Sequence, residues 1–225
     1  MISIKRLPGL LKDYLLNIIL YETRLQNQAT QMRGIATIEE WVSLGRPIPG
    51  PAVYKESVVK GFQSFFKTKE LIETGTVTGE MVDAVKDLFP SIITIEIDKK
   101  LARRAKRKFK KYPHIHVLEG DSAEVLPRLI QEKKGQCIYW LDGHYSGGVT
   151  GRGEKDTPIV EELNEIFKNY QNDIILIDDA RSFNLNHNYP TIEVVTELCK
   201  NFVKDINVEV KYDIIRIYRG QKIEV

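Results

Sequence analysis

Short apolar runs alternate with longer amphipathic segments along most of the chain after residue 70. The runs have the length and the β-branched composition of buried strands, and the segments between them have helical periodicity. This alternation predicts βαβ units with right-handed crossovers and a parallel sheet covered by helices on both faces. We expect strands at residues 70–74, 91–97, 115–119, 136–141 and 173–178. Helices are expected between them, at about residues 78–88, 98–111, 122–133 and 157–170.

The end of the chain breaks this alternation. A helix is expected at residues 191–204, followed by two close apolar runs at residues 208–211 and 214–218. The connection between these runs is so short that it can only join antiparallel strands. The pattern therefore predicts an α/β fold of the Rossmann-like, doubly wound type, mostly parallel with an antiparallel end.

The beginning of the chain has a different pattern. A single long helix is expected at residues 8–33. Its apolar stripe either packs on the main domain, contacts a second copy in a homodimer, or faces the substrate because the helix acts as a lid. The proline-rich stretch at residues 44–51 can form neither a helix nor a central strand, and a further helix is expected at residues 52–66. We expect residues 1–50 to form a helical extension and residues 51–225 to form the main domain.

Acidic residues follow the expected parallel strands. They are Glu73, Glu96, Glu119 with Asp121, Asp142, and Asp178 with Asp179. The carboxyl ends of parallel strands share one edge, and open α/β sheets bind their ligands outside that edge. The sequence therefore predicts a ligand site lined by carboxylates.

A glycine turn follows the first of these strands. Gly75 and Gly79 would let backbone N–H groups approach a bound cofactor closely. Glu96, about twenty residues later, is placed to accept hydrogen bonds from ribose hydroxyls. The pair Asp121 and Ser122 opens the helix after the third strand, where the amine of an adenine could be recognised, or where the pair could simply cap that helix. Asp98 is better explained as a helix cap.

Two cofactors have these features in common, a dinucleotide and S-adenosylmethionine. The dinucleotide fingerprint requires glycine at the middle of the turn, where backbone meets the pyrophosphate, and this chain has Val77 there. S-adenosylmethionine carries no pyrophosphate and tolerates a side chain at that position. The turn therefore favours S-adenosylmethionine.

Four motifs together resemble the successive signatures of class I S-adenosylmethionine-dependent methyltransferases. They are ETGTVTG at residues 73–79, TIEID at 94–98, LEGDS at 118–122 and WLDGH at 140–144. The resemblance covers about residues 52–219 and implies a seven-stranded sheet of order 3-2-1-4-5-7-6 with an antiparallel last strand. It also implies a cofactor site made of Glu73, Gly75, Thr76, Gly79, Glu96, Ile97, Asp121, Ser122 and Asp142.

Within this class, the first motif looks most like that of cation-dependent O-methyltransferases of the catechol and caffeoyl type and their sugar-modifying relatives. Those enzymes bind a metal after the fourth and fifth strands, at positions that Asp142, Asp178 and Asp179 match. Three converging carboxylates would also repel one another unless a cation neutralised them, and oxygen ligands suit Mg²⁺ or a similar ion. Such an ion would acidify an acceptor hydroxyl. The implied activity is metal-assisted O-methylation of a small molecule or sugar.

Asp142 and His144 are the candidate catalytic residues. His144 could take the proton of the acceptor or bind the metal, and His187 is a weaker candidate. The glycine-rich loop at residues 143–155 predicts a substrate lid. The alternatives are a metal-independent methyltransferase with His144 as its base, a nicotinamide-dependent oxidoreductase, and a cofactor-binding protein without catalysis.

The composition narrows the class of protein further. A net charge of +2 over 225 residues argues against wholesale binding of nucleic acid, although the basic helix at residues 99–111 is either a solvated surface or a docking face. The two cysteines, Cys137 and Cys199, fall in apolar runs and are expected to be buried, which suits a reducing cytoplasm. No uninterrupted apolar run approaches the ~20 residues of a membrane span.

Overall fold

The computed structural model describes residues 35–143, 157–184 and 189–224. The chain divides into two compact units, Met1–Tyr54 and Lys55–Val225. In the first unit, helix α2 (Ile38–Ser43) carries Trp41, whose ring centroid lies 4.4 Å from that of Tyr54. The division into an extension and a main domain stays a prediction, and the helix expected at residues 8–33 lies outside the described residues.

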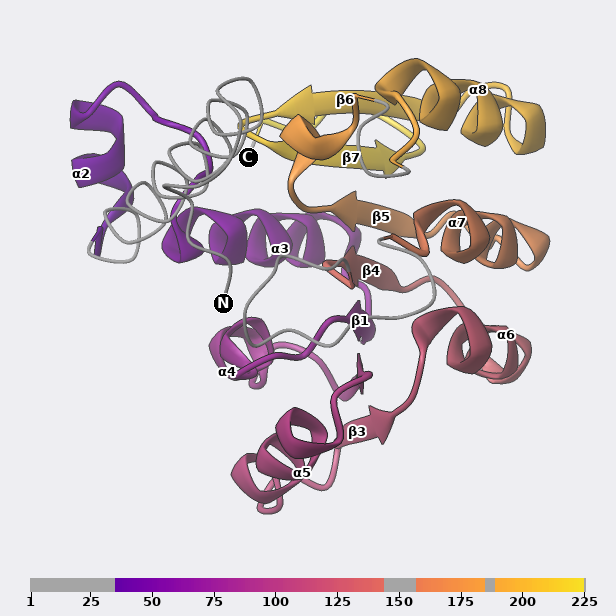
Figure 1. Ribbon diagram of the computed structural model, residues 1–225. Coiled ribbons are helices and arrows are strands. Elements are labelled where there is room, and N and C mark those ends of the chain that lie inside the picture. The colour runs from indigo at the N-terminus through magenta and orange to yellow at the C-terminus, as the bar shows by residue number, and fades with distance from the viewer. Residues whose placement is uncertain (1–34, 144–156, 185–188, 225) are drawn as a thin grey trace, which may run out of the picture. The chain divides into compact units, whose positions relative to one another are not determined.

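The second unit is built on a seven-stranded sheet with the order β3-β2-β1-β4-β5-β7-β6 (Figure 1). Five neighbouring strands are parallel, whereas β7 is antiparallel to both β5 and β6. This is the fold class that the sequence pattern predicts, with the strand order that the resemblance to class I methyltransferases implies. The strands are β1 (Glu70–Thr74), β2 (Ser91–Glu96), β3 (Ile115–Glu119), β4 (Ile138–Leu141), β5 (Ile174–Ile177), β6 (Asn207–Lys211) and β7 (Ile214–Tyr218).

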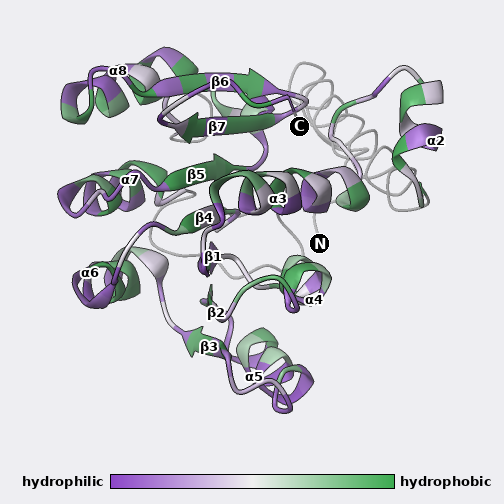
Figure 2. Ribbon diagram, turned by 180° about the vertical axis from the view of Figure 1, so that it is seen from behind, coloured by the Kyte–Doolittle hydropathy of each residue, from purple (hydrophilic) through white to green (hydrophobic). Residues whose placement is uncertain are grey.

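Helices cover both faces of the sheet. Helices α3, α4 and α5 lie on one face, and α6, α7 and α8 lie on the other, as both views show (Figures 1 and 2). Their bounds are α3 (Ala52–Phe66), α4 (Glu80–Val85), α5 (Lys99–Lys108), α6 (Ser122–Glu132), α7 (Ile159–Lys168) and α8 (Ile192–Phe202). Each expected helix after residue 52 is present. Helix α4 begins later than predicted because its N-cap, Gly79, has left-handed backbone angles that do not belong to a helix, and it ends earlier than predicted, at Val85.

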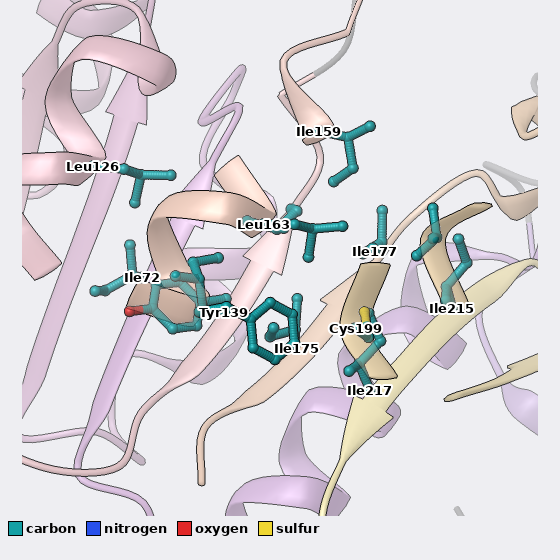
Figure 3. Packing of buried hydrophobic residues seen from close by; sticks show 14 of the residues in the cluster. Ile72, Leu126, Tyr139, Ile159, Leu163, Ile175, Ile177, Cys199, Ile215 and Ile217 are labelled. Atoms are coloured by element: carbon teal, nitrogen blue, oxygen red, sulfur yellow. The ribbon is translucent and has the colours of Figure 1, made fainter. Parts of the chain in front are cut away.

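The main hydrophobic core lies between the sheet and helices α6, α7 and α8 (Figure 3). Strands β4 and β5 are buried along their lengths, and β5 is also hydrophobic throughout (Figure 2), as expected for central strands with both faces covered. Leu163 of α7 and Ile175 of β5 are fully buried in this cluster. Both cysteines are free and buried, as predicted. The packing leaves the carboxyl ends of the parallel strands as one edge to which several loops contribute.

Candidate functional site

The glycine turn after β1 meets the end of β4 at the carboxyl edge. The N–H of Asp142 donates to the carbonyl of Thr74 at 3.0 Å, which extends the pairing of β1 and β4. Gly75 has φ +87°, and a Cβ at that position would lie 2.3 Å from the carbonyl oxygen of Asp142. Only glycine fits both the backbone angle and the space. A side chain at Gly75 would therefore disturb the protein before it met a ligand.

Gly79 is also constrained by the protein. Its φ is +70°, and a Cβ there would lie 2.7 Å from the ring of Phe109, which follows α5. Both glycines are predicted from the sequence to let backbone approach a ligand. In the structure, glycine is already required at each position because this turn packs against the end of β4 and against Phe109.

Glu96 is locked in place by two backbone groups. Its side chain is buried at the end of β2, where Oε2 accepts from the N–H of Val77 at 2.7 Å. Its Oε1 accepts from the N–H of Asp98 at 2.8 Å. Val77 has φ +47°, an unusual conformation for a β-branched residue, and this conformation accompanies the hydrogen bond to Glu96. The glycine turn and the predicted ribose-binding carboxylate thus form one rigid arrangement.

Glu73 is buried beneath the same turn. Its Oε2 accepts from the hydroxyl of Thr94, and the hydroxyls of Thr94 and Thr76 are hydrogen-bonded to each other. Burial raises the pKa of Glu73 to about 8; the bond from Thr94 opposes this effect, and the charges of Asp142 and Glu96 add to it. Near neutral pH, Glu73 is therefore mostly an uncharged acid that a nearby cation could ionise.

The remaining predicted cofactor residues surround the ends of β2 and β3. Asp98 caps α5 by accepting from the N–H groups of Lys100 and Leu101, as expected. Asp121 is the N-cap of α6, and its Oδ1 accepts from the N–H of Ala123 at 3.0 Å. Ser122 is buried, and Ile97 is half-buried directly after β2. The capping role of Asp121 is observed, and its role toward adenine stays a prediction.

The three predicted metal ligands follow β4 and β5. Asp142 is half-buried, Asp178 is buried, and both lie at the edge where β4 and β5 end side by side. Strand β5 ends at Ile177, and Asp179 has left-handed backbone angles (φ +57°). Two consecutive aspartates on a regular strand would point to opposite faces. The end of the strand removes that constraint.

Cations of the protein itself are paired with these carboxylates. Lys55 of α3 donates to Oδ2 of Asp178, and its Nζ lies 3.8 Å from Oδ1 of Asp179. Arg181 donates to Oδ1 of Asp179 at 2.7 Å and also to Asp213, in the turn between β6 and β7. Among the described residues, no group of three or more His, Cys, Asp or Glu side chains has an arrangement that could hold a metal ion.

The arrangement therefore does not fit the predicted divalent ion. Both oxygens of Asp178 already accept hydrogen bonds, Oδ1 from the N–H of Asp179 at 2.8 Å and Oδ2 from Lys55. Converging carboxylates need a neutralising cation, and two side chains of the protein itself, Lys55 and Arg181, meet this need for Asp178 and Asp179. Nothing in the local sequence marks Lys55, because its partner Asp178 is 123 positions away.

A small cavity of about 10 Å³ lies beside Asp178. It has room for about one water molecule. Its lining comes from the ends of β4 and β5 and the start of α7, and includes Leu141, Gly143, Ile159, Ile177, Asp178 and Phe183.

The histidine candidates have different outcomes. His144, His187 and nearly all of the glycine-rich loop lie outside the described residues, so their predicted roles as base and lid stay predictions. His114 is hydrogen-bonded to the carbonyl of Lys86 at 2.9 Å and so has a structural contact, as expected. His116 lies on β3 and is exposed.

Three solved structures resemble this chain over most of its length. The SAH-bound methyltransferase PaMTH1 of Podospora anserina is 16% identical with a TM-score of 0.52, over 89% of this chain and 96% of that chain. The O-methyltransferase TomG of Streptomyces achromogenes, in complex with SAM, is 12% identical with a TM-score of 0.54, over 85% and 89%. The O-methyltransferase of Bacillus cereus, in complex with SAH, is 11% identical with a TM-score of 0.54, over 86% and 91%.

These likenesses show the fold. The chain has the class I methyltransferase fold, which the four motifs predicted. No family model matches the sequence, and no curated protein does. In the part of the chain that the structure describes, no helix is both long and apolar enough to cross a membrane. The predicted cytoplasmic location, the homodimer, and the absence of a nucleic-acid partner stay predictions.

Proposed function

We propose that this protein is an S-adenosylmethionine-dependent methyltransferase that methylates a hydroxyl group of a small molecule or sugar. The observation that carries the proposal is the turn after β1. There, Gly75 closes on Asp142, and Glu96 is oriented by the N–H of Val77, at the point where the strand order reverses. Ligands of open α/β sheets bind at such a point.

The residues of this edge have complementary roles in the proposed cofactor site. Glu96 is the proposed acceptor for the ribose hydroxyls, since backbone groups hold its two oxygens in a defined orientation. Glu73 is the proposed partner of the cofactor's ammonium group, because a cation would ionise a carboxyl whose pKa burial has raised to about 8. Asp121 and Ser122 are the proposed adenine contacts at the start of α6.

The chemistry needs an acceptor oxygen that gives up its proton. When bound, S-adenosylmethionine supplies a methyl group on a positively charged sulfur. Asp142 is the described residue proposed to receive or relay the acceptor's proton, because it follows β4 directly beside the glycine turn. His144 remains the proposed alternative base.

The pairing of Asp178 and Asp179 with Lys55 and Arg181 favours the metal-independent version of this reaction. Transfer to oxygen is supported by the solved O-methyltransferases TomG and the Bacillus cereus enzyme, which share the fold at 11–12% identity. The choice of a small molecule or sugar rests on the motifs at residues 73–79 and 140–144.

Calorimetry with S-adenosylhomocysteine, the demethylated product, tests the cofactor. We expect binding by the wild type and at least about tenfold weaker binding by Glu96→Ala, because two hydrogen bonds to a charged group are lost. Tighter binding of NAD than of S-adenosylhomocysteine would favour the oxidoreductase instead. Methyl transfer from labelled S-adenosylmethionine to a panel of hydroxyl, amine and thiol compounds then tests the acceptor. Labelling of amines alone would refute O-methylation.

A further inference from the structure

Lys55 is placed among three acidic residues that belong to the ends of two strands. It lies in α3, whereas Asp142 follows β4 and Asp178 and Asp179 follow β5. Its side chain is 22% exposed, and that of its hydrogen-bonded partner Asp178 is 2% exposed. The pair is thus largely removed from water, where each charge depends on the other.

The carboxylates hold Lys55 in its charged form. Its ammonium group donates to Oδ2 of Asp178 and lies 3.8 Å from Oδ1 of Asp179. These contacts place a positive charge where the sequence motifs predict a divalent ion. Arg181 adds a second cation at Oδ1 of Asp179, the same oxygen that Lys55 approaches.

We propose that Lys55 is a positioning residue whose ammonium group is the resident cation of this edge, in place of a divalent metal ion. It holds Asp178 and Asp179 at the end of β5 through Oδ2 of Asp178 and Oδ1 of Asp179. The inference rests on the proposed function in one respect only, which is that the methyl acceptor binds at this edge. The pairing of Lys55 with the carboxylates stands on the contacts alone.

The proposal has a direct consequence for metal binding. Lys55→Met keeps most of the length of the side chain and removes the charge, so Asp142, Asp178 and Asp179 lose a shared cation. Among the described residues, these side chains are not arranged to hold a metal ion while Lys55 is present. Without the charge of Lys55 their repulsion is uncompensated, and a hard divalent ion should draw them together. The variant should therefore acquire a metal site that the wild type does not have.

Mn²⁺ titration of the full chain, followed by electron paramagnetic resonance, measures this gain. We expect the wild type to have no site tighter than about 1 mM, and Lys55→Met to bind Mn²⁺ at least about tenfold more tightly than the wild type. The double variant Lys55→Met/Asp178→Asn should lose the gain. Lys60→Met is the matched control, because Lys60 lies on the same helix and pairs with Glu56 at 3.3 Å; it should behave as wild type.

Two results would overturn the proposal. One is a Mn²⁺ site in the wild type that is lost in Asp178→Asn. This measurement does not depend on whether any Lys55 variant folds. The other is a folded Lys55→Met protein that gains no Mn²⁺ affinity. Lys55→Arg, which keeps the charge, should fold and resemble the wild type in the same titration. A gain of Mn²⁺ affinity in Lys55→Arg would equally count against a role for the charge.

The same proteins separate this proposal from the proposed function. Lys55→Met should bind S-adenosylhomocysteine within about threefold of the wild type, because Lys55 is not among the proposed cofactor contacts. Failure of the wild type to bind S-adenosylhomocysteine would overturn the methyltransferase proposal and leave the metal result standing. Once an acceptor is found, Lys55→Met should lower kcat and Lys55→Arg should restore part of it.

Discussion

Glu73 should make the stability of this protein fall as the pH rises through neutrality. The folded protein holds the proton of Glu73 up to a pKa of about 8, whereas the unfolded chain loses it near 4.5. Between these two values the folded state binds more protons, so the free energy of unfolding decreases with rising pH. The contribution of Glu73 to the free energy of unfolding is fully present below pH 4.5 and is lost by about pH 8.

The size of the effect follows from the two pKa values. Each pH unit inside the window costs about 1.4 kcal/mol, and the whole window from 4.5 to about 8 costs about 5 kcal/mol as an upper bound. Between pH 5.5 and 7.5 the expected loss is therefore about 2–3 kcal/mol. For a domain of this size, that loss is a large share of the total stability.

Glu73→Gln removes the titration and keeps the shape of the side chain. Urea unfolding at several pH values should give a wild-type stability that falls relative to that of the variant as the pH rises. Taking the difference between the two proteins cancels the titration of groups they share. Thr94→Val removes a hydrogen bond that favours the ionised form of Glu73, so the pKa of Glu73 should rise further. In this variant, the fall in the free energy of unfolding should therefore continue to higher pH than in the wild type. If the difference in the free energy of unfolding between the wild type and Glu73→Gln stays constant from pH 5.5 to 7.5, the reasoning is refuted.

Three further variants test the packing that supports the site. Gly75→Ala should cost about 2 kcal/mol or more, because its Cβ would lie 2.3 Å from a backbone oxygen at φ +87°. Asp98→Ala should cost about 1 kcal/mol, because α5 loses its cap. Lys133→Met should cost about 3–5 kcal/mol, because it leaves Asp173 as a buried charge without its cation. Urea unfolding measures all three.

Each of these expectations has its own control. Gly135 has φ +124° with no atom within 4 Å of a built Cβ, so Gly135→Ala should cost less than Gly75→Ala. Equal costs would show that the close contact at Gly75 does not matter. Full helical signal and unchanged stability in Asp98→Ala would contradict the cap. The double variant Lys133→Met/Asp173→Asn should recover part of the loss, and no recovery would contradict the proposed pairing.

Local patterns in the sequence determined the secondary structure and the sheet. Strand β1 occupies the predicted residues, and the hairpin of β6 and β7 follows from a connection too short for parallel strands. The cap at Asp98 was predictable because a helix cap depends on residues two and three positions away. The gathering of acidic residues at one edge followed from parallel strands alone.

Only the tertiary structure decided what those acidic residues contact. Packing of α3 and of the β6–β7 turn brings Lys55 and Asp213 to the end of β5, and no periodicity encodes either approach. The reason for Gly75 likewise became visible only when β1 paired with β4 and placed the carbonyl of Asp142 beside it. Charge pairing and burial depend on distances between segments that are far apart in the sequence. The sequence therefore predicted an acidic edge, and the packing determined that Lys55 and Arg181 pair with the two aspartates after β5.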